Sequence, residues 1–298
     1  MTGVIAAVAT PVASNGTLDV ATFERLIDFL IESGVDGLCL GGATSEYPYV
    51  AIPDRTLAIG AVARRLPLDR ALLVAIGASS FRQVLELGES AREARSRAVL
   101  LPMPMFFRYE QHDLEAFSIE VSRTLRTPLL LYDLPDFTNP LEPATAIRLL
   151  ENEELIVGIK DSSGIVGNLV YYAEARGERP WTLLVGSDRL LYAGLKAGWN
   201  GTISGIACFC PSLVVAIHRS WTRGDTDRAA HLQTLLNEVV LQLDTLPTPW
   251  GIRIALEAQG FSMGPHPLPL SPVRRQRVTS FREWVGGWMD RVRGAVSG

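Results

Sequence analysis

The sequence has 298 residues, 47% of them hydrophobic, and a formal net charge of -4 at pH 7. A chain of this length and composition can bury a large core, which suits one α/β barrel or two ordinary domains. The sequence has no block of basic residues that could neutralise the phosphates of a nucleic acid. We therefore expect small-molecule partners and no nucleic acid. No apolar run approaches the roughly 20 residues that span a bilayer, and the N-terminal stretch lacks a basic leader and cleavage site. We therefore expect a cytoplasmic protein that does not associate with a membrane.

Eight short, continuously apolar runs alternate with helix-compatible sequence. Continuous apolar character is typical of parallel strands that are buried on both faces, and no dinucleotide-binding fingerprint indicates an open doubly wound sheet. The pattern predicts an α/β fold, a (β/α)8 TIM barrel. The predicted strands lie within residues 4–11, 37–42, 71–77, 97–102, 128–135, 155–161, 182–188 and 201–206.

The first connection shows the helical period. Asp19 can cap a helix, and Gly34 supplies a plausible stop. Apolar side chains fall on one stripe between them, at Phe23, Leu26, Ile27, Leu30 and Ile31.

Further helical patterns follow the eighth strand. They cover residues 211–223, 225–243, 249–259 and 273–294, with a Pro-rich loop before the last of them. No long linker or repeat separates two units. We predict a barrel over residues 1–223 and a C-terminal helical extension of the same domain over residues 224–298.

Lysine is almost absent from this chain, and this limits the chemistry. The only lysines are Lys160 and Lys196. Arginine cannot replace lysine as an amine nucleophile, because its guanidinium stays protonated. Lys160 ends an apolar strand, where active sites of barrels lie and where desolvation favours the free amine that attacks a carbonyl. Lys196 falls in a helical pattern, where a solvated side chain is the ordinary outcome.

Other polar residues end predicted strands as well. Tyr132 ends the fifth run, Asp188 ends the seventh, and Thr44 follows the second. Tyr132 could donate and accept a proton beside Lys160 in carbon–carbon cleavage. The alternatives are an ion pair between Lys160 and Asp161 or another carboxylate, and a core aromatic role for Tyr132.

Metal chemistry has little support. The four histidines are scattered, and Cys208 and Cys210 form only a C-x-C pair. With Cys39 they make three cysteines without a disulfide framework, which favours a reducing compartment and small buried side chains. We expect no metal.

Three motifs carry a family resemblance. GIKDSSG (158–164), YDLP (132–135) and GGATSE (41–46) resemble the dihydrodipicolinate synthase and N-acetylneuraminate lyase superfamily. The resemblance implies a TIM barrel with a helical extension, a homotetramer or homodimer, and no cofactor. It assigns Lys160 the imine with pyruvate or a related 2-oxo acid, and Tyr132 the general acid/base role.

The same resemblance implies residues that bind the substrate. Thr44 would hold the substrate carboxylate together with backbone amides near Ala43 and Thr44. The neighbouring Ser45 belongs to the same predicted substrate-binding loop. Ile203 and Ser204 would line the pyruvate pocket from the eighth strand.

Several residues depart from the family pattern. Ala43 and Ser45 stand where the family usually has a hydroxyl residue and a glycine, and Phe106 stands where it has a second tyrosine, which could relay a proton. Asp133 and Cys208 replace asparagines. All of these changes except Asp133 favour the alternative of a degenerate, non-catalytic homologue that only binds a 2-oxo acid, whereas the retention of Lys160 and Tyr132 argues for activity.

The choice of reaction depends on the residues around these motifs. Phe137 stands where the synthase carries an arginine for a second carboxylate. YDLPDFTNP and EYPYV resemble segments of 2-keto-3-deoxy sugar acid aldolases and 4-hydroxy-2-oxoglutarate aldolases. We predict a carbon–carbon lyase that cleaves a 2-oxo-3-deoxy or 4-hydroxy-2-oxo acid to pyruvate or glyoxylate plus an aldehyde or 2-oxo acid. A dehydratase and a dihydrodipicolinate synthase remain alternatives.

Overall fold

A computed structural model describes residues 1–297 as a closed barrel of eight parallel strands. Gly298, the last residue of the predicted extension, lies outside the described residues. Each strand pairs with the next in the chain, and β8 closes the barrel on β1. Each predicted run coincides with one strand, although the first strand begins one residue before its run, and this confirms the TIM barrel. The strands are β1 (Gly3–Ala7), β2 (Gly37–Leu40), β3 (Ala71–Ala75), β4 (Ala98–Pro102), β5 (Leu129–Asp133), β6 (Ile156–Asp161), β7 (Thr182–Val185) and β8 (Gly201–Ser204).

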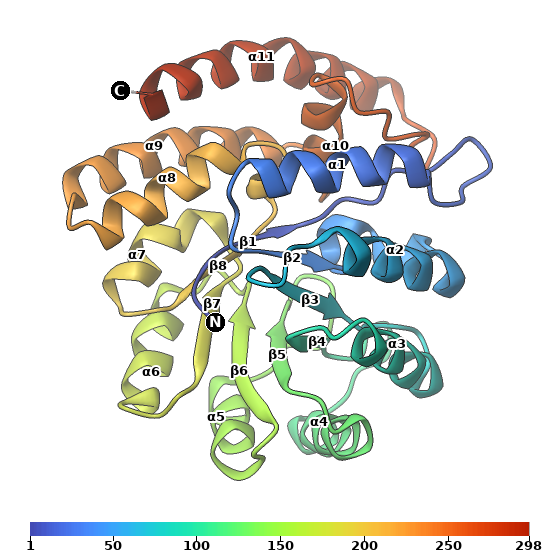
Figure 1. Cartoon of the computed structure of the whole chain (residues 1–298), viewed down its shortest axis with the longest axis vertical. Helices are drawn as coiled ribbons and strands as arrows, with labels where there is room; N and C mark the ends of the chain where they lie inside the picture. The colour runs from blue at the N-terminus through green and yellow to red at the C-terminus, as the bar shows by residue number, and fades with distance from the viewer. Residues whose placement is uncertain (298) are drawn as a thin grey trace.

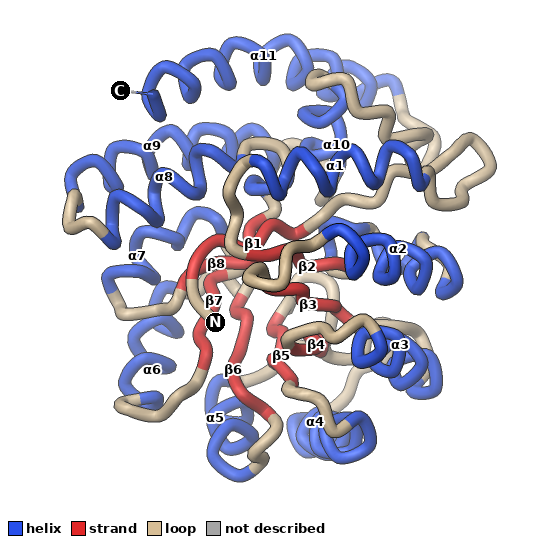
Figure 2. The backbone as a smooth tube through the Cα atoms, in the orientation of Figure 1, coloured by secondary structure: helices blue, strands red, loops and turns tan. Residues whose placement is uncertain are grey.

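Helices surround the strands, as Figures 1 and 2 show. The first of them begins as predicted: the Asp19 side chain accepts a hydrogen bond from the Thr22 amide at 3.1 Å and satisfies a free donor of the first turn. Its apolar stripe is buried against the barrel. The ring comprises α1 (Val20–Glu32), α2 (Ile52–Arg65), α3 (Phe81–Glu93), α4 (Gln111–Leu125), α5 (Pro143–Asn152), α6 (Val166–Arg176), α7 (Leu191–Lys196) and α8 (Pro211–Thr222).

Three more helices form the C-terminal part, α9 (Thr226–Leu243), α10 (Trp250–Glu257) and α11 (Pro272–Ser297). They lie on one side of the barrel, outside α8 and α1 (Figure 1). Trp288 of α11 is buried, and its indole donates to the Leu235 carbonyl at 3.0 Å. The helical extension is confirmed, and the boundary at residues 223 and 224 stays a prediction. Among residues 1–297, no helix is long and apolar enough to cross a membrane.

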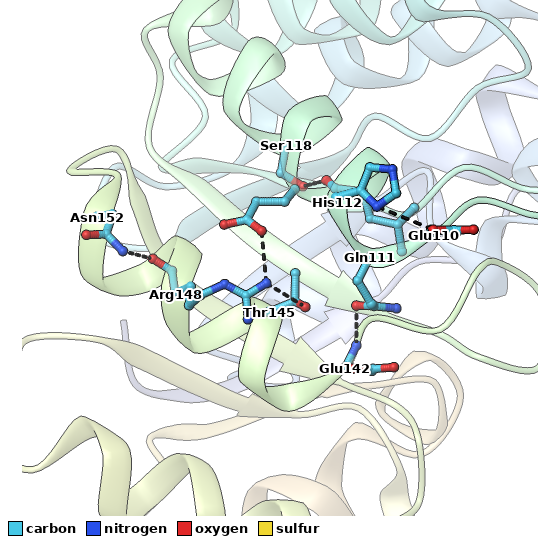
Figure 3. Close-up of polar contacts among 10 residues, drawn as sticks. Glu110, Gln111, His112, Ser118, Glu142, Thr145, Arg148 and Asn152 are labelled. Atoms are coloured by element: carbon cyan, nitrogen blue, oxygen red, sulfur yellow. Dashed lines mark hydrogen bonds and ion pairs between the residues drawn. The ribbon is translucent and has the colours of Figure 1, made fainter.

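Polar contacts join neighbouring helices of the ring. Figure 3 shows this between α4 and α5, where Gln111 accepts a hydrogen bond from the Glu142 amide at 3.0 Å. Arg148 of α5 donates to Thr145 of its own helix at 3.2 Å and forms an ion pair with Glu115 of α4 at 2.9 Å. These pairs are largely exposed, so apolar burial between the helices and the strands supplies most of the stability.

The apolar core has two layers. The larger layer lies between the strands and the helices. The smaller fills the inside of the barrel and includes Tyr132 together with Ile203 and Leu134. The barrel is therefore closed below its mouth by packed side chains, and a substrate can reach only the carboxyl ends of the strands.

Candidate active site

Lys160 and Tyr132 meet at the carboxyl ends of β6 and β5. The strand register places their Cα atoms opposite each other, and the Lys160 ammonium donates to the Tyr132 hydroxyl at 3.1 Å. Lys160 Nζ also lies 4.2 Å from the centre of the Tyr132 ring. Both side chains are buried, with 5% and 1% of their surface exposed. An amine and a phenol thus share one water-poor site, the arrangement that imine chemistry with proton transfer needs.

A glycine makes room for the lysine. Gly186 follows β7, and a Cβ atom there would lie 2.9 Å from Lys160 Cε and 2.0 Å from Ser162 Oγ. Any larger residue would displace the lysine from its place beside Tyr132. The sequence alone gives no sign of this role, because the close approach arises only when β6 and β7 pair.

Asp188 is a half-buried residue whose carboxylate lies near the lysine. It accepts hydrogen bonds from the Ser204 hydroxyl and from the Ile206 amide, the latter at 3.5 Å. Burial raises the pKa of Asp188 to about 6, and the positive charge of Lys160 acts in the opposite direction. Ser204, predicted to line the substrate pocket, thus turns its hydroxyl toward Asp188 and accepts from the Ala207 amide at 2.9 Å. The sequence marks Asp188 as a strand-end residue but does not reveal this partner.

The predicted carboxylate loop is a short turn of 3-10 helix, Ala43–Ser45, after β2. Thr44 is buried, and its hydroxyl oxygen lies 3.3 Å from the position that a Cβ atom would take at Gly205, just beyond β8. Ser45 points elsewhere: its hydroxyl donates to the Val8 carbonyl at 2.6 Å and accepts from the Gly41 amide at 2.9 Å. Thr44 therefore offers its hydroxyl at the mouth, whereas that of Ser45 holds the loop to β1.

Ile203 completes the set of predicted residues. It is fully buried in β8 and belongs to the same inner layer as Tyr132, with Ala43 packed against that layer. The structure thus gathers all seven predicted site residues at one end of the barrel. Their roles in binding stay predictions.

A buried ion pair supports the carboxylate loop. Glu46, at the end of the GGATSE motif, accepts from Arg253 of α10 at 2.6 Å. The second arm of Arg253 donates to the carbonyls of Met263, Gly264 and Pro265 at 2.7, 3.1 and 2.9 Å. The C-terminal part thereby contacts the mouth of the barrel directly. The sequence gives no sign of this contact, since its partners stand 207 residues apart.

A cavity of about 500 Å³ opens at this mouth. It lies between the loops after β2, β4 and β5 and the segments that precede α10 and α11. Its described lining comprises Ala43, Glu46, Tyr47, Pro48, Tyr49, Met105, Leu134, Phe137, Pro247, Thr248, Pro249, Trp250, Pro267, Leu268, Pro269, Ser271 and Arg274.

Comparison with known proteins identifies the family. The model of the dihydrodipicolinate synthetase family matches residues 1–286. The chain belongs to this family. Its members are pyruvate-dependent class I aldolases and lyases that use a Schiff-base lysine and no cofactor.

Similar members of the dihydrodipicolinate synthetase family have different named activities. The chain is 31% identical over 292 residues to the putative 2-dehydro-3-deoxy-D-gluconate aldolase YagE of Escherichia coli K12, covering 94% of this chain and 95% of that protein. It is 32% identical to 4-hydroxy-tetrahydrodipicolinate synthase 1 of Streptomyces coelicolor, covering 91% and 89%. The crystal structure of YagE with pyruvate superposes with a TM-score of 0.88 at 28% identity, covering 97% and 99% of the chains.

Phe106 of this chain departs from the pattern of the dihydrodipicolinate synthetase family. Its ring is 92% exposed, its φ is 75°, and it packs edge-on against Phe107 with ring centroids 5.0 Å apart. A phenylalanine cannot pass a proton, so Tyr132 is the phenol that lies within hydrogen-bonding distance of Lys160.

The cysteines are free and buried, as predicted. Burial raises the pKa of Cys39 to about 11 and that of Cys208 to about 12. The Cys208 sulfur accepts from the Ala9 amide at 3.3 Å, a structural contact beside β1. Within residues 1–297 no group of three histidine, cysteine or acidic side chains could hold a metal ion.

Proposed function

We propose that this protein is a class I aldolase that forms an imine between Lys160 and a 4-hydroxy-2-oxo or 2-oxo-3-deoxy acid, and cleaves it between C3 and C4. The products are pyruvate, from C1 to C3, and an aldehyde or second 2-oxo acid such as glyoxylate, from C4 onward. The observation that carries the proposal is the buried contact of 3.1 Å between the Lys160 amine and the Tyr132 hydroxyl. Family membership supports it, as does the name of YagE.

The geometry suits each step of the reaction. The Lys160 amine attacks the C2 carbonyl, and the Tyr132 phenol donates its proton to the departing water, which gives an iminium ion and a phenolate. Tyr132 then accepts the proton of the C4 hydroxyl; the C3–C4 electrons move toward the iminium nitrogen and an aldehyde departs. Protonation of the resulting enamine at C3 and hydrolysis release pyruvate and restore the amine. The Thr44 hydroxyl and the adjacent amides would hold the carboxylate throughout.

The alternatives have weaker support. The synthase reaction needs a cation for a second carboxylate, and Phe137 occupies the position where the resemblance places an arginine. A binding protein without activity would not need a desolvated lysine beside a phenol. Burying both groups lowers stability, and only a catalytic role offsets that loss. Dehydration shares the imine and differs only in the bond that breaks.

Product analysis tests the proposal. The protein would be incubated with a panel of 4-hydroxy-2-oxo and 2-oxo-3-deoxy acids, and pyruvate and aldehyde quantified by proton NMR. We expect cleavage of at least one acid by wild type and by Lys196→Ala, and none by Lys160→Ala. Cleavage that survives in Lys160→Ala, or no cleavage of any member of the panel, would contradict it.

A further inference from the structure

The cavity at the barrel mouth is lined by residues that neighbour Tyr132 and Thr44 in the chain, although Lys160 and Tyr132 are not part of its described lining. Leu134, two residues after Tyr132, lines the cavity and belongs to the same packed layer as Tyr132. Ala43, beside Thr44, lines it as well. Tyr47, which is buried, also lines the cavity. The part of a Lys160-bound substrate that lies beyond the pyruvate moiety would extend toward this cavity, because both lie at the mouth of the barrel.

The lining of this cavity is mostly apolar. Five of its residues are prolines, which have no backbone N–H to donate a hydrogen bond to a substrate hydroxyl. Five more are large or apolar side chains that suit contact with a flat ring. These ten residues are Pro48, Pro247, Pro249, Pro267, Pro269, Met105, Leu134, Phe137, Trp250 and Leu268.

Three polar side chains of the lining, Glu46, Tyr47 and Arg274, already have partners within the protein. One Glu46 oxygen is bound to Arg253, which leaves the other as a single buried acceptor. The Tyr47 hydroxyl contacts the sulfur of Met105 at 3.6 Å. Arg274, the only cation among the described lining residues, donates to the Thr245 carbonyl at 3.0 Å and lies over the Trp250 ring. A tail with several hydroxyls would lose more hydrogen bonds to water than this cavity can replace.

From this lining we propose that the aldehyde released on cleavage is apolar and bears a ring, so that the substrate is a 4-hydroxy-2-oxo acid with an aryl group at C4. The inference rests on the proposed function and narrows its substrate class. A dry cavity of about 150 Å³ holds benzene, so about 500 Å³ accommodates a substituted aryl ring.

The aldol reaction in the direction of condensation tests the inference. With excess pyruvate, carbon–carbon bond formation would be followed with benzaldehyde and, in parallel, with D-glyceraldehyde, and kcat/KM compared. We expect benzaldehyde to be favoured about tenfold or more, the range that a shape-matched apolar pocket supplies. Preference for D-glyceraldehyde would overturn the inference.

Two variants of lining residues and one control variant test whether this cavity determines the preference between the two aldehydes. Phe137 and Leu268 are half-exposed, with 51% and 54% of their surface accessible, so an acidic residue there should be compatible with folding. Phe137→Asp and Leu268→Asp should each lower the ratio of kcat/KM for benzaldehyde to that for D-glyceraldehyde about tenfold. Leu68, fully exposed after α2 and outside the cavity, gives the matched control Leu68→Asp, which should keep the wild-type ratio. An unchanged ratio in both lining variants would contradict the inference.

Borohydride trapping distinguishes a wrong substrate class from a wrong proposed function. If wild type forms a pyruvate adduct but prefers D-glyceraldehyde, the imine mechanism stands and the aryl substrate is wrong. If no adduct forms with pyruvate or with longer 2-oxo acids, the proposed function itself is wrong, and the inference fails with it.

Discussion

Lys160 and Tyr132 occupy the same register position on two adjacent parallel strands, and this places the amine 3.1 Å from the phenol oxygen. Side chains alternate between the two faces of a strand. The next register pair, Asp133 and Asp161, therefore belongs to the outer face, where Tyr172 of α6 also lies close to both carboxylates. One pair of strands thus supplies a reactive pair inside the barrel and a pair of carboxylates outside it.

Tyr132→Phe should separate imine formation from turnover. The variant keeps the ring but loses the hydroxyl that accepts from Lys160. Since a positioned acid/base group contributes about 10²- to 10⁴-fold, kcat for cleavage should fall by about that factor. Pyruvate should still be trapped on Lys160 by borohydride. A kcat within a few-fold of wild type would show that another group transfers the proton.

Thr44 and Ser45 should respond differently to loss of their hydroxyls. Thr44→Val keeps the side-chain volume, and we expect a higher KM for the 2-oxo acid with little change in thermal stability. Ser45→Ala leaves the Val8 carbonyl and the Gly41 amide without their partner, which should cost about 1–3 kcal/mol of unfolding free energy. Steady-state kinetics and denaturant titration on both variants check this contrast. The reverse pattern would place the substrate carboxylate at Ser45.

The Glu46–Arg253 pair should be important for stability. Arg253→Met leaves Glu46 buried without its counter-charge, and the loss should be about 3–5 kcal/mol of unfolding free energy. The exposed pair of Arg291 and Glu238 provides a matched control, because Arg291→Met should cost less than about 1 kcal/mol. Denaturant titration measures both. Equal, small losses would mean that water reaches Glu46 in solution.

Asp133 should make stability depend on pH. Burial raises the pKa of Asp133 from 3.8 to about 6, and the charge of Asp161 contributes to the rise. The folded protein therefore binds this proton more tightly than the unfolded chain, and stability from this group is lost as pH rises from about 4 to 6.

Asp133→Asn removes that charge and can still accept from the Leu141 amide, the contact that Asp133 makes at 3.0 Å. It should raise the unfolding free energy at pH 7.5 by about 1–3 kcal/mol, and by much less near pH 4. Denaturant titration at the two pH values checks this. A gain of the same size at both would assign the effect to packing.

The sequence predicts the strands well because each is a continuous apolar run, and the cap at Asp19 because its partner Thr22 is local. It predicts Lys160 because only two lysines exist and one of them ends a strand. What it misses depends on distant partners. Arg253 reaches Glu46 from α10, and Gly186 matters because the side chains of Ser162 and Lys160 pack against it.

Side-chain direction is a second limit. Ser45 and Ser204 fall at the predicted site, yet their hydroxyls turn to Val8 and to Asp188. A pattern of residue types places a side chain at the mouth of the barrel, but the surrounding donors and acceptors decide where its oxygen points. The apolar cavity is likewise assembled from five separate segments and has no signature in any one of them.

The central claim is that Lys160 forms an imine, and trapping tests it most directly. The pure protein would be incubated with pyruvate and sodium borohydride, and the mass adduct located by peptide mapping. Lys160→Arg, which keeps a cation but has no amine nucleophile, and Lys196→Arg serve as matched variants. We predict an adduct confined to Lys160 in wild type and in Lys196→Arg, and none in Lys160→Arg. An adduct on Lys196, or none with pyruvate or any longer 2-oxo acid, would contradict the imine mechanism.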